Sequence, residues 1–357
     1  PLLRGFGTTA TLAEARMAKS DLRAAEQGLR GKIDQIASNV LDAYIEAIYG
    51  HELIRVITDR IAVAGRLRDE NEKRLKQGLM APIDVMQAES TRAAAEIELV
   101  RARNFLTETE NRMRELIFSD FSQAADVQFS FVDQLSEVTL QESLPALRGL
   151  ALNRSAEYQV ALQKVETQKL ALRLARNQRL PSLDVEASYG MNGLGDSFSS
   201  GFSDYGNRDK PDYSVGLIAD IPLTFHAERA QLARAMLSVR QAELEAKRTA
   251  NSVVSQVQTA HARVLSAIQR AKASARAVET AETALSSEEK RLANGLTTSF
   301  NVLKLQDELA QARINKLEAV AEGHKALVIL WGVSGVLLER YQINAIETPG
   351  AAARAAK

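Results

Sequence analysis

The amino-acid sequence predicts a mainly α-helical protein with a small β part, and three observations support this fold class. The seven prolines leave residues 2–81 and 223–348 free of proline, which breaks helix interiors. Both stretches are rich in Ala, Leu, Glu, Arg, Lys and Gln, which favour helices. Between them, two short segments alternate apolar and polar residues, as strands do. The sequence therefore predicts very long helices and one β-hairpin.

The first long helix is expected to run from near Thr11 to Gln77, because strong helix formers fill this stretch without interruption by proline. At about 1.5 Å per residue, such a helix would be roughly 100 Å long. A compact domain cannot contain it. The aromatic content of 5% is also low for one large globular core.

The chain contains an internal repeat. When residues 72–79 are placed on residues 289–296, six of the eight residues are identical. Pro1-Leu2 also matches Pro222-Leu223 when four residues are allowed for a length difference. The spacing is far longer than the roughly 20–50 residues of solenoid repeats, so each copy is a large unit.

Each repeat is predicted to be a helical hairpin. Gly78 and Gly295 fit the position after a helix C-terminus, where glycine is favoured. Pro82, and Thr298 or Ser299, fit the start of the partner helix. Because the connections hold only a few residues, the two helices of each pair should be antiparallel and packed as in a coiled coil. The expected partner helices cover 83–116 and 300–330.

Between the repeats, the sequence predicts a helix over 144–179 and then two strands. Apolar residues occupy every second position of 183–189 and of 213–221, and Ile218 is the one exception to the alternation. The segment 190–212 is rich in Gly, Ser, Asp and Asn, which is typical of an exposed loop. An isolated hairpin is marginally stable, so these strands must meet others.

The expected domain organisation follows from these elements. It comprises a first repeat over 1–141 with its tip near 78–82, a helix over 142–181, a β-hairpin over 182–222 with its exposed loop over 190–212, a second repeat over 223–345 with its tip near 295–299, and a disordered C-terminal tail over 346–357.

Composition and motifs argue against several functions. The 45 basic and 45 acidic residues cancel, so no field attracts nucleic acid, and the absence of cysteine excludes disulfides and thiolate metal sites. The four histidines are too scattered for a local metal motif. Carboxylate pairs lie among basic neighbours, as on a solvated helix face. We therefore expect neither an enzyme nor a cofactor or metal.

Taken together, these residues resemble the outer-membrane efflux protein family, the TolC-like channels, over essentially all of the chain. The segments that carry the resemblance are Leu144-Pro145-Ala146-Leu147, Leu180-Pro181-Ser182-Leu183, the two Pro-Leu pairs, and the duplicated tips with Arg-Leu followed by Gly-Leu. Their order, spacing and duplication are specific together, although no single motif is.

The resemblance implies a homotrimer in which each chain gives four strands to a 12-stranded outer-membrane β-barrel, continued by a long periplasmic α-barrel. Each repeat of the family normally contributes one β-hairpin. Here only the second is expected, and the first β-hairpin, the first N-terminal helix and a signal peptide are expected to be missing from this chain.

The function implied by the resemblance is that of the outer-membrane channel in a tripartite efflux pump of a Gram-negative bacterium. Such a channel is a passive trimeric conduit that exports small molecules and works with a periplasmic adaptor protein and an inner-membrane RND or ABC transporter. Two alternatives stay open: an exit channel for type I protein secretion with an ABC transporter, and a coiled-coil scaffold that does not enter a membrane.

The resemblance also implies site residues at the two tips. The expected adaptor-docking residues are Arg74, Leu75, Gly78, Leu79, Arg291, Leu292, Gly295 and Leu296. The expected pore entrance comprises Asp84, Asn301 and Lys304. Many family members carry acidic side chains after the second tip, whereas three copies of Lys304 would favour anions.

Opening of the channel would require the hairpins to rearrange at the tip. Gly50 and Gly65 interrupt the first long helix, and two roles are open for them. They could act as flexure points, or they could allow close contact between helices.

Overall fold

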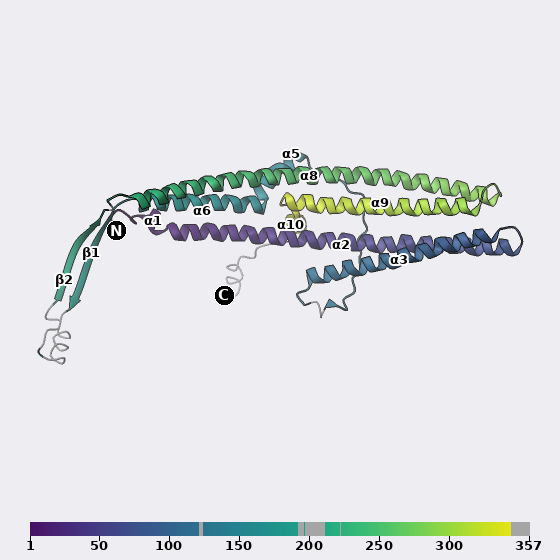
Figure 1. Ribbon diagram of the computed structural model, residues 1–357, viewed down its shortest axis with the longest axis horizontal. Helices are drawn as coiled ribbons and strands as arrows, with labels where there is room; N and C mark the ends of the chain where they lie inside the picture. Colours follow the sequence, from purple (N-terminus) through teal and green to yellow (C-terminus); the bar gives the residue numbers. More distant parts are fainter. Residues whose placement is uncertain (121–123, 192–195, 197–210, 222, 344–357) are drawn as a thin grey trace. The chain divides into compact units, whose positions relative to one another are not determined.

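The computed structural model describes all residues except 121–123, 192–195, 197–210, 222 and 344–357 (Figure 1). The elements of the described part are α1 (Thr8–Thr11), α2 (Ala13–Lys76), α3 (Pro82–Ile117), α5 (Leu144–Arg154), α6 (Ala156–Gln178), β1 (Ser182–Met191), β2 (Pro211–Asp220), α8 (His226–Ala293), α9 (Ser299–Val333) and α10 (Leu337–Arg340). The predicted fold class is confirmed: long helices accompany one small antiparallel sheet. No helix among these residues is long and apolar enough to cross a membrane.

The chain forms two compact units, and α2 and α8 contribute to both. The first unit comprises residues 1–29 and 156–251, and the second comprises residues 30–155 and 252–357. Each unit thus draws on both repeats. The expected boundaries between repeats stay a prediction, and the expected C-terminal tail lies outside the described residues.

In the second unit the long helices pair as hairpins. Arg112 of α3 forms ion pairs with Asp42 and Glu46 of α2, at 2.8 and 2.9 Å. Between α8 and α9, the guanidinium of Arg313 lies 2.8 Å from the carboxylate of Glu282. These contacts tie each outgoing helix to its returning partner.

Heptad spacing of buried residues explains how these helices pack. Buried residues recur at every seventh position: Gly50, Ile57, Ala64 and Asn71 in α2, and Ala88, Ala95, Ala102 and Thr109 in α3. A seven-residue repeat keeps one side of the helix facing its partner only if the two helices form a left-handed supercoil. Because most of these residues are small, the helix backbones approach closely.

The two glycines of α2 differ in their surroundings. A Cβ atom added at Gly50 would lie 3.3 Å from Cδ1 of Phe105, whereas one added at Gly65 would meet nothing within 4 Å. Gly50 therefore allows close contact between α2 and α3. Gly65 has no such packing role.

The expected continuous helix over 144–179 is instead two helices, α5 and α6. The break is at Ser155, whose ψ of 120° is not helical. Gly335, with a φ of +68°, packs against this point, since a Cβ atom there would lie 2.9 Å from the carbonyl of Arg154. The end of α9 is thereby fixed against the end of α5.

In the first unit, the start of α2 packs on α6. The hydroxyl of Ser20 donates to the carbonyl of Gln163 at 3.1 Å, and Thr167 donates to Asp21 at 3.0 Å. Val165 of α6 packs with Ala242 and Ala246 of α8. Helix α6 thus contacts α2 through hydrogen bonds and α8 through small apolar side chains.

The two strands of the first unit pair so that their apolar residues coincide. Leu183 lies opposite Ala219, Val185 opposite Leu217, Ala187 opposite Val215 and Tyr189 opposite Tyr213. The other face carries mainly polar pairs, and the hydroxyls of Ser188 and Ser214 lie 2.9 Å apart on it. The strands include Gly190, Met191, Pro211 and Asp212, which the sequence assigned to the loop; most of the remaining loop lies outside the described residues, as does Pro222.

The hairpin tips as the candidate functional site

The first tip is a glycine-terminated turn between α2 and α3. Gly78 has a φ of +72°, which favours glycine. The N–H of Leu79 donates to the carbonyl of Arg74 at 2.9 Å, and the N–H of Gly78 donates to Leu75 at 2.9 Å. This pair of bonds is the Schellman motif, which satisfies carbonyls at a helix end. Pro82 then begins α3.

The second tip has the same geometry. Gly295 has a φ of +73°. The N–H of Leu296 donates to Arg291 at 2.9 Å, and that of Gly295 donates to Leu292 at 3.0 Å. The duplicated residues of the sequence therefore form duplicated turns.

Both tips present apolar side chains to solvent. Leu79 is 73% exposed and Leu296 is 68% exposed, although the leucine of a Schellman motif commonly packs back on its helix. One turn further along, Ile83 and Phe300 are also more than half exposed. These four residues occupy matching positions in the two repeats. Each tip therefore exposes two apolar side chains.

The arginines of the tips form ion pairs with acidic residues of their own helices. Arg74 forms an ion pair with Glu70, one turn earlier. Arg291 lies 3.0 Å from Glu288, whose carboxylate also accepts a hydrogen bond from the hydroxyl of Thr297 at 2.5 Å. Both guanidiniums therefore have an acidic partner on their own helix, beside the turn.

A buried polar contact joins the two tips. The hydroxyl of Ser299 donates to Oδ1 of Asn71 at 3.0 Å, and both residues are only 1% exposed. The amide of Asn71 also donates to the backbone carbonyl of Asp84 at 3.3 Å. Around this contact, Leu67 and Ala88 of the first hairpin pack with Val302 and Leu303 of the second, and Leu292 packs on this cluster.

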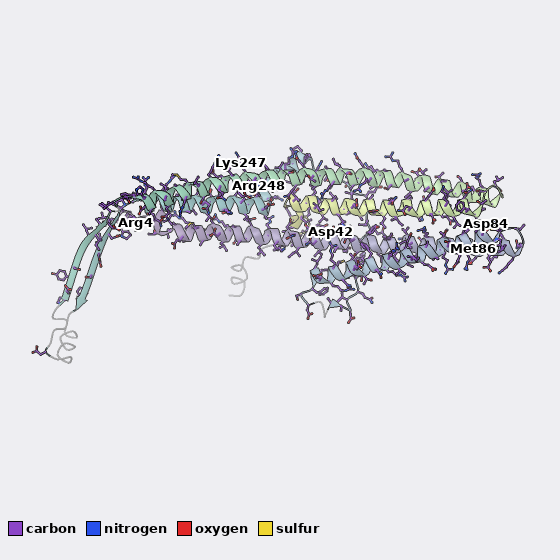
Figure 2. The ribbon with its side chains drawn as sticks, viewed as in Figure 1. Arg4, Asp42, Asp84, Met86, Lys247 and Arg248 are labelled. Carbon is purple, nitrogen blue, oxygen red and sulfur yellow. The ribbon has the colours of Figure 1, made fainter. Side chains whose placement is uncertain are left out.

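The three expected pore-entrance residues do not contact one another through hydrogen bonds or ion pairs in the described part of the chain. Asn301 donates from its amide to Thr297 at 3.0 Å, which ties it to its own turn. Lys304 lies 3.9 Å from the carboxylate of Glu308, and both side chains are exposed. Asp84 is half-buried, and Figure 2 shows it beside Met86 near the start of α3.

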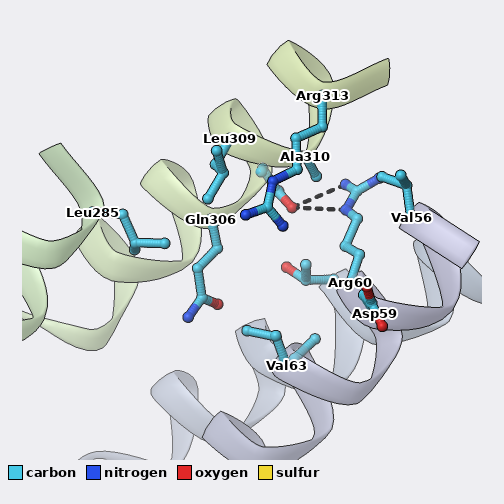
Figure 3. A pocket seen from close by; sticks show the side chains of 12 residues that line it. Val56, Asp59, Arg60, Val63, Leu285, Gln306, Leu309, Ala310 and Arg313 are labelled. Carbon is cyan, nitrogen blue, oxygen red and sulfur yellow. Dashed lines mark hydrogen bonds and ion pairs between the residues drawn. The ribbon is translucent and has the colours of Figure 1, made fainter. Parts of the chain in front are cut away.

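Further from the tip, Arg60 of α2 links the two hairpins. Its guanidinium lies 2.6 Å from Glu98 of α3 and 2.9 Å from Asp307 of α9. The dashed lines in Figure 3 mark the bonds from Arg60 to Asp307, at the edge of a cavity of about 70 Å³. Organic ligands occupy sites of roughly 300–1,000 Å³, so this cavity is a packing feature and no ligand site.

Metal ligation finds no support among the described residues, because no three His, Asp or Glu side chains are grouped closely enough to hold an ion. The tips instead present exposed apolar side chains, guanidiniums paired within their own helices, and a buried hydrogen bond.

The model of the family "Outer membrane efflux protein" matches residues 147–335, which is more than half of the chain. The chain belongs to this family. The membership gives the protein an outer-membrane location. Among curated proteins, the chain is similar to the outer membrane protein TolC of Vibrio cholerae, with 23% identity over 303 residues. This similarity covers 85% of the chain and 66% of that relative's length, so the chain spans somewhat less than two thirds of it.

Solved structures of outer-membrane channels share the fold of this efflux-family chain. The outer membrane protein VceC of Vibrio cholerae superposes with a TM-score of 0.76 and 20% identity, over 92% of this chain and 76% of its own. The channel CmeC of Campylobacter jejuni superposes with a TM-score of 0.74 and 13% identity, over 98% and 71%. The long helical hairpins are thus the helical barrel elements of TolC-like channels.

Sequence reasoning identified the tip glycines and leucines but missed two groups of residues. The exposed Ile83 and Phe300 follow the expected helix starts, and their alignment between the repeats could have revealed them. Asn71 and Ser299 gave no such signal, because a buried contact over 228 residues of sequence separation has no local pattern.

Proposed function

We propose that the protein is the outer-membrane channel of a tripartite efflux pump, a passive trimeric conduit whose tips dock a periplasmic adaptor. The observation that carries the proposal is the duplicated tip, in which two identical turns each expose a leucine and a second apolar residue one turn later. A trimer would present six such surfaces on one ring. An inner-membrane transporter would supply the energy.

The strand pair supports the same proposal. Its two strands place their apolar residues on one face and mostly polar residues on the other, which suits a wall between lipid and water. Three chains would have to combine their strands to close such a wall. The long helices would continue the conduit with water on both sides, which agrees with their many charged residues.

The adaptor would bind the tips by apolar contact. Leu79 and Ile83 on one tip and Leu296 and Phe300 on the other fit the ends of a partner's helices. Because Asn71 and Ser299 join the tips, the adaptor would meet both surfaces as one bipartite site.

The experiment that tests this function uses the complete natural chain in a strain that lacks its own copy and depends on the pump for resistance. Gly295→Asp should abolish resistance while the trimer persists, because it places a negative charge next to the exposed Leu296 in the docking turn. Gly295→Asn is the matched control, since asparagine has the same shape and the same backbone preference as aspartate but brings no charge to the docking turn. Unaltered resistance in Gly295→Asp would refute docking at this turn.

A further inference from the structure

A group of arginines that have no acidic partner among the described residues lies at the helix ends next to the strands of the first unit. We name them the basic collar: Arg4, Arg173, Arg176, Arg179, Arg229 and Arg234. All six side chains are exposed, and no carboxylate of the described residues forms an ion pair with any of them. Many arginines elsewhere in the chain, such as Arg60 and Arg112, do have acidic partners.

The collar is close to the point where the strands begin. Arg173 and Arg176 occupy the last turns of α6, Arg179 follows its end, and β1 starts at Ser182. The N–H of Gly5 donates to the side chain of Asn177 at 2.7 Å, which places Arg4 beside the same turns; Figure 2 labels Arg4 there. Arg229 and Arg234 lie within the first turns of α8, on the chain that returns from β2.

Local helix electrostatics explain only part of this pattern. Cations near a helix C-terminus are favoured by the helix dipole, which accounts for Arg176 and Arg179 at the end of α6. Arg229 lies at the N-terminal end of α8, where the same dipole disfavours a cation. A separate anionic partner would account for arginines at both ends.

The charge of the neighbouring sequence is strongly one-sided. The stretches 1–23, 169–181 and 223–240 hold eleven lysines and arginines against three carboxylates, in a chain whose formal charge is zero. The acidic residues of the strands, Asp184, Glu186 and Asp220, share the face opposite the apolar one. The positive charge therefore gathers at the base of the strand pair.

The apolar face of the strand pair is exposed. Tyr189, Tyr213, Val215 and Leu217 are each more than two thirds exposed, and Leu223 beyond β2 is fully exposed. An apolar face that ends near guanidiniums without a carboxylate partner among the described residues matches the chemistry of a membrane leaflet, in which acyl chains end at phosphate groups.

We propose that the basic collar binds the anionic head groups of phospholipids. These lipids belong to the membrane leaflet nearer to the helices, where the strand pair emerges from the bilayer. The proposal rests on the proposed channel function, because that function places the strands in a bilayer. Each guanidinium donates two parallel hydrogen bonds to phosphate oxygens, which a lysine ammonium cannot do in the same way. The collar sets the depth and tilt of the strands, and its affinity for anionic lipid falls with salt.

The test uses the complete natural chain, purified in a neutral detergent, with phosphatidylglycerol and phosphatidylcholine offered in equal amounts and bound lipid counted by native mass spectrometry. Wild-type protein should retain phosphatidylglycerol about tenfold more than phosphatidylcholine. The triple variant Arg173→Gln/Arg176→Gln/Arg179→Gln should lose most of this preference. The matched control is Arg263→Gln/Lys272→Gln/Arg276→Gln, which removes three exposed and unpaired bases of the second unit and should keep it.

Three outcomes separate the collar from the channel function. The proposed lipid site is overturned if the collar variant keeps the wild-type preference for phosphatidylglycerol, or if the control variant loses this preference to the same extent. Competition by inorganic phosphate as effective as that by phosphatidylglycerol overturns lipid recognition in favour of a general anion site. A wild-type protein that neither conducts in planar bilayers nor floats with vesicles refutes the channel instead. Should the triple variant fail to fold, Arg229→Gln/Arg234→Gln on α8 provides the same test.

Discussion

The hydroxyl of Ser299 donates a hydrogen bond to Oδ1 of Asn71 across 3.0 Å, and water reaches neither side chain. The two residues belong to different repeats, so this bond joins the hairpins at the end where the channel would open. Low dielectric strengthens the bond, and breaking it leaves each buried polar group with one partner fewer. The tips of one chain should therefore move together.

Asn71→Ala and Ser299→Ala should each lower the free energy of unfolding by about 1–2 kcal/mol, because each leaves the other side chain buried with one partner fewer. Chemical denaturation of the purified protein, followed by circular dichroism, measures both. The double variant should cost less than the sum of the single ones by about 1 kcal/mol. Strictly additive losses of unfolding free energy would mean that the hydrogen bond provides no coupling energy between the two side chains.

Gly65→Ala and Gly50→Ala are a matched pair within α2. Alanine at 65 meets open space and favours the helix, so it should stabilise the protein by about 0.5–1 kcal/mol. Alanine at 50 meets Phe105 and should stabilise less or destabilise. Melting temperatures compare the two variants directly. A larger gain from Gly50→Ala would contradict the packing role of that glycine.

Arg60→Leu should destabilise the protein by about 2 kcal/mol, since it leaves Glu98 and Asp307 without their shared cation. The guanidinium is only 17% exposed, so solvent cannot replace it fully. Arg55→Leu is the control, because Arg55 is 69% exposed and forms only a local pair with Glu52. Equal losses in the two variants would show that the inter-hairpin link contributes nothing.

Asp34 should make stability depend on pH. Burial raises the pKa of its carboxyl to about 6, against the lowering effect of Arg30. An acid whose pKa is raised by folding stabilises the protein at low pH, and this contribution is lost as the pH rises through about 6. Because solvent partly screens this half-buried carboxyl, Asp34→Asn should gain only about 1 kcal/mol relative to wild type near neutral pH, and little below about pH 4. The free energy of unfolding of wild type and Asp34→Asn, measured across this range, should diverge as the pH rises; a gain independent of pH would contradict the assignment.

Lys304→Asp should increase the cation preference of the channel. Three exposed lysines at the pore entrance, each partly compensated by Glu308 at 3.9 Å, should leave the wild type only weakly selective for cations. Reversal potentials of the complete protein in planar bilayers measure this change, and Lys272→Asp on α8 is the control. Strong cation selectivity in the wild type would refute a pore-lining position for Lys304.

Much of this fold could be predicted because its signals are local. Proline and glycine positions delimit the long helices, and Gly78 and Gly295 adopt the positive φ that their position after a helix requires. The alternation in the two strands also matches the observed register. Each signal depends on backbone chemistry within a few residues.

Other features depend on distant parts of the chain. The break at Ser155 is stabilised by contact with Gly335, and no pattern between 144 and 179 marks it. The raised pKa of Asp34 arises from burial in the folded state. The arginines of the basic collar are visible in the sequence, but only folding brings Arg4 next to the end of α6.

The tip contact has a consequence for how the two halves of the chain came to differ. Under the alignment of the repeats, Asn71 matches Glu288 and Ser299 matches Pro82. The first tip thus has proline where the second has the donor hydroxyl, and the second has glutamate where the first has the acceptor amide. The halves have become complementary instead of equivalent. A chimera carrying two first tips would form both turns and still lose the bond between them.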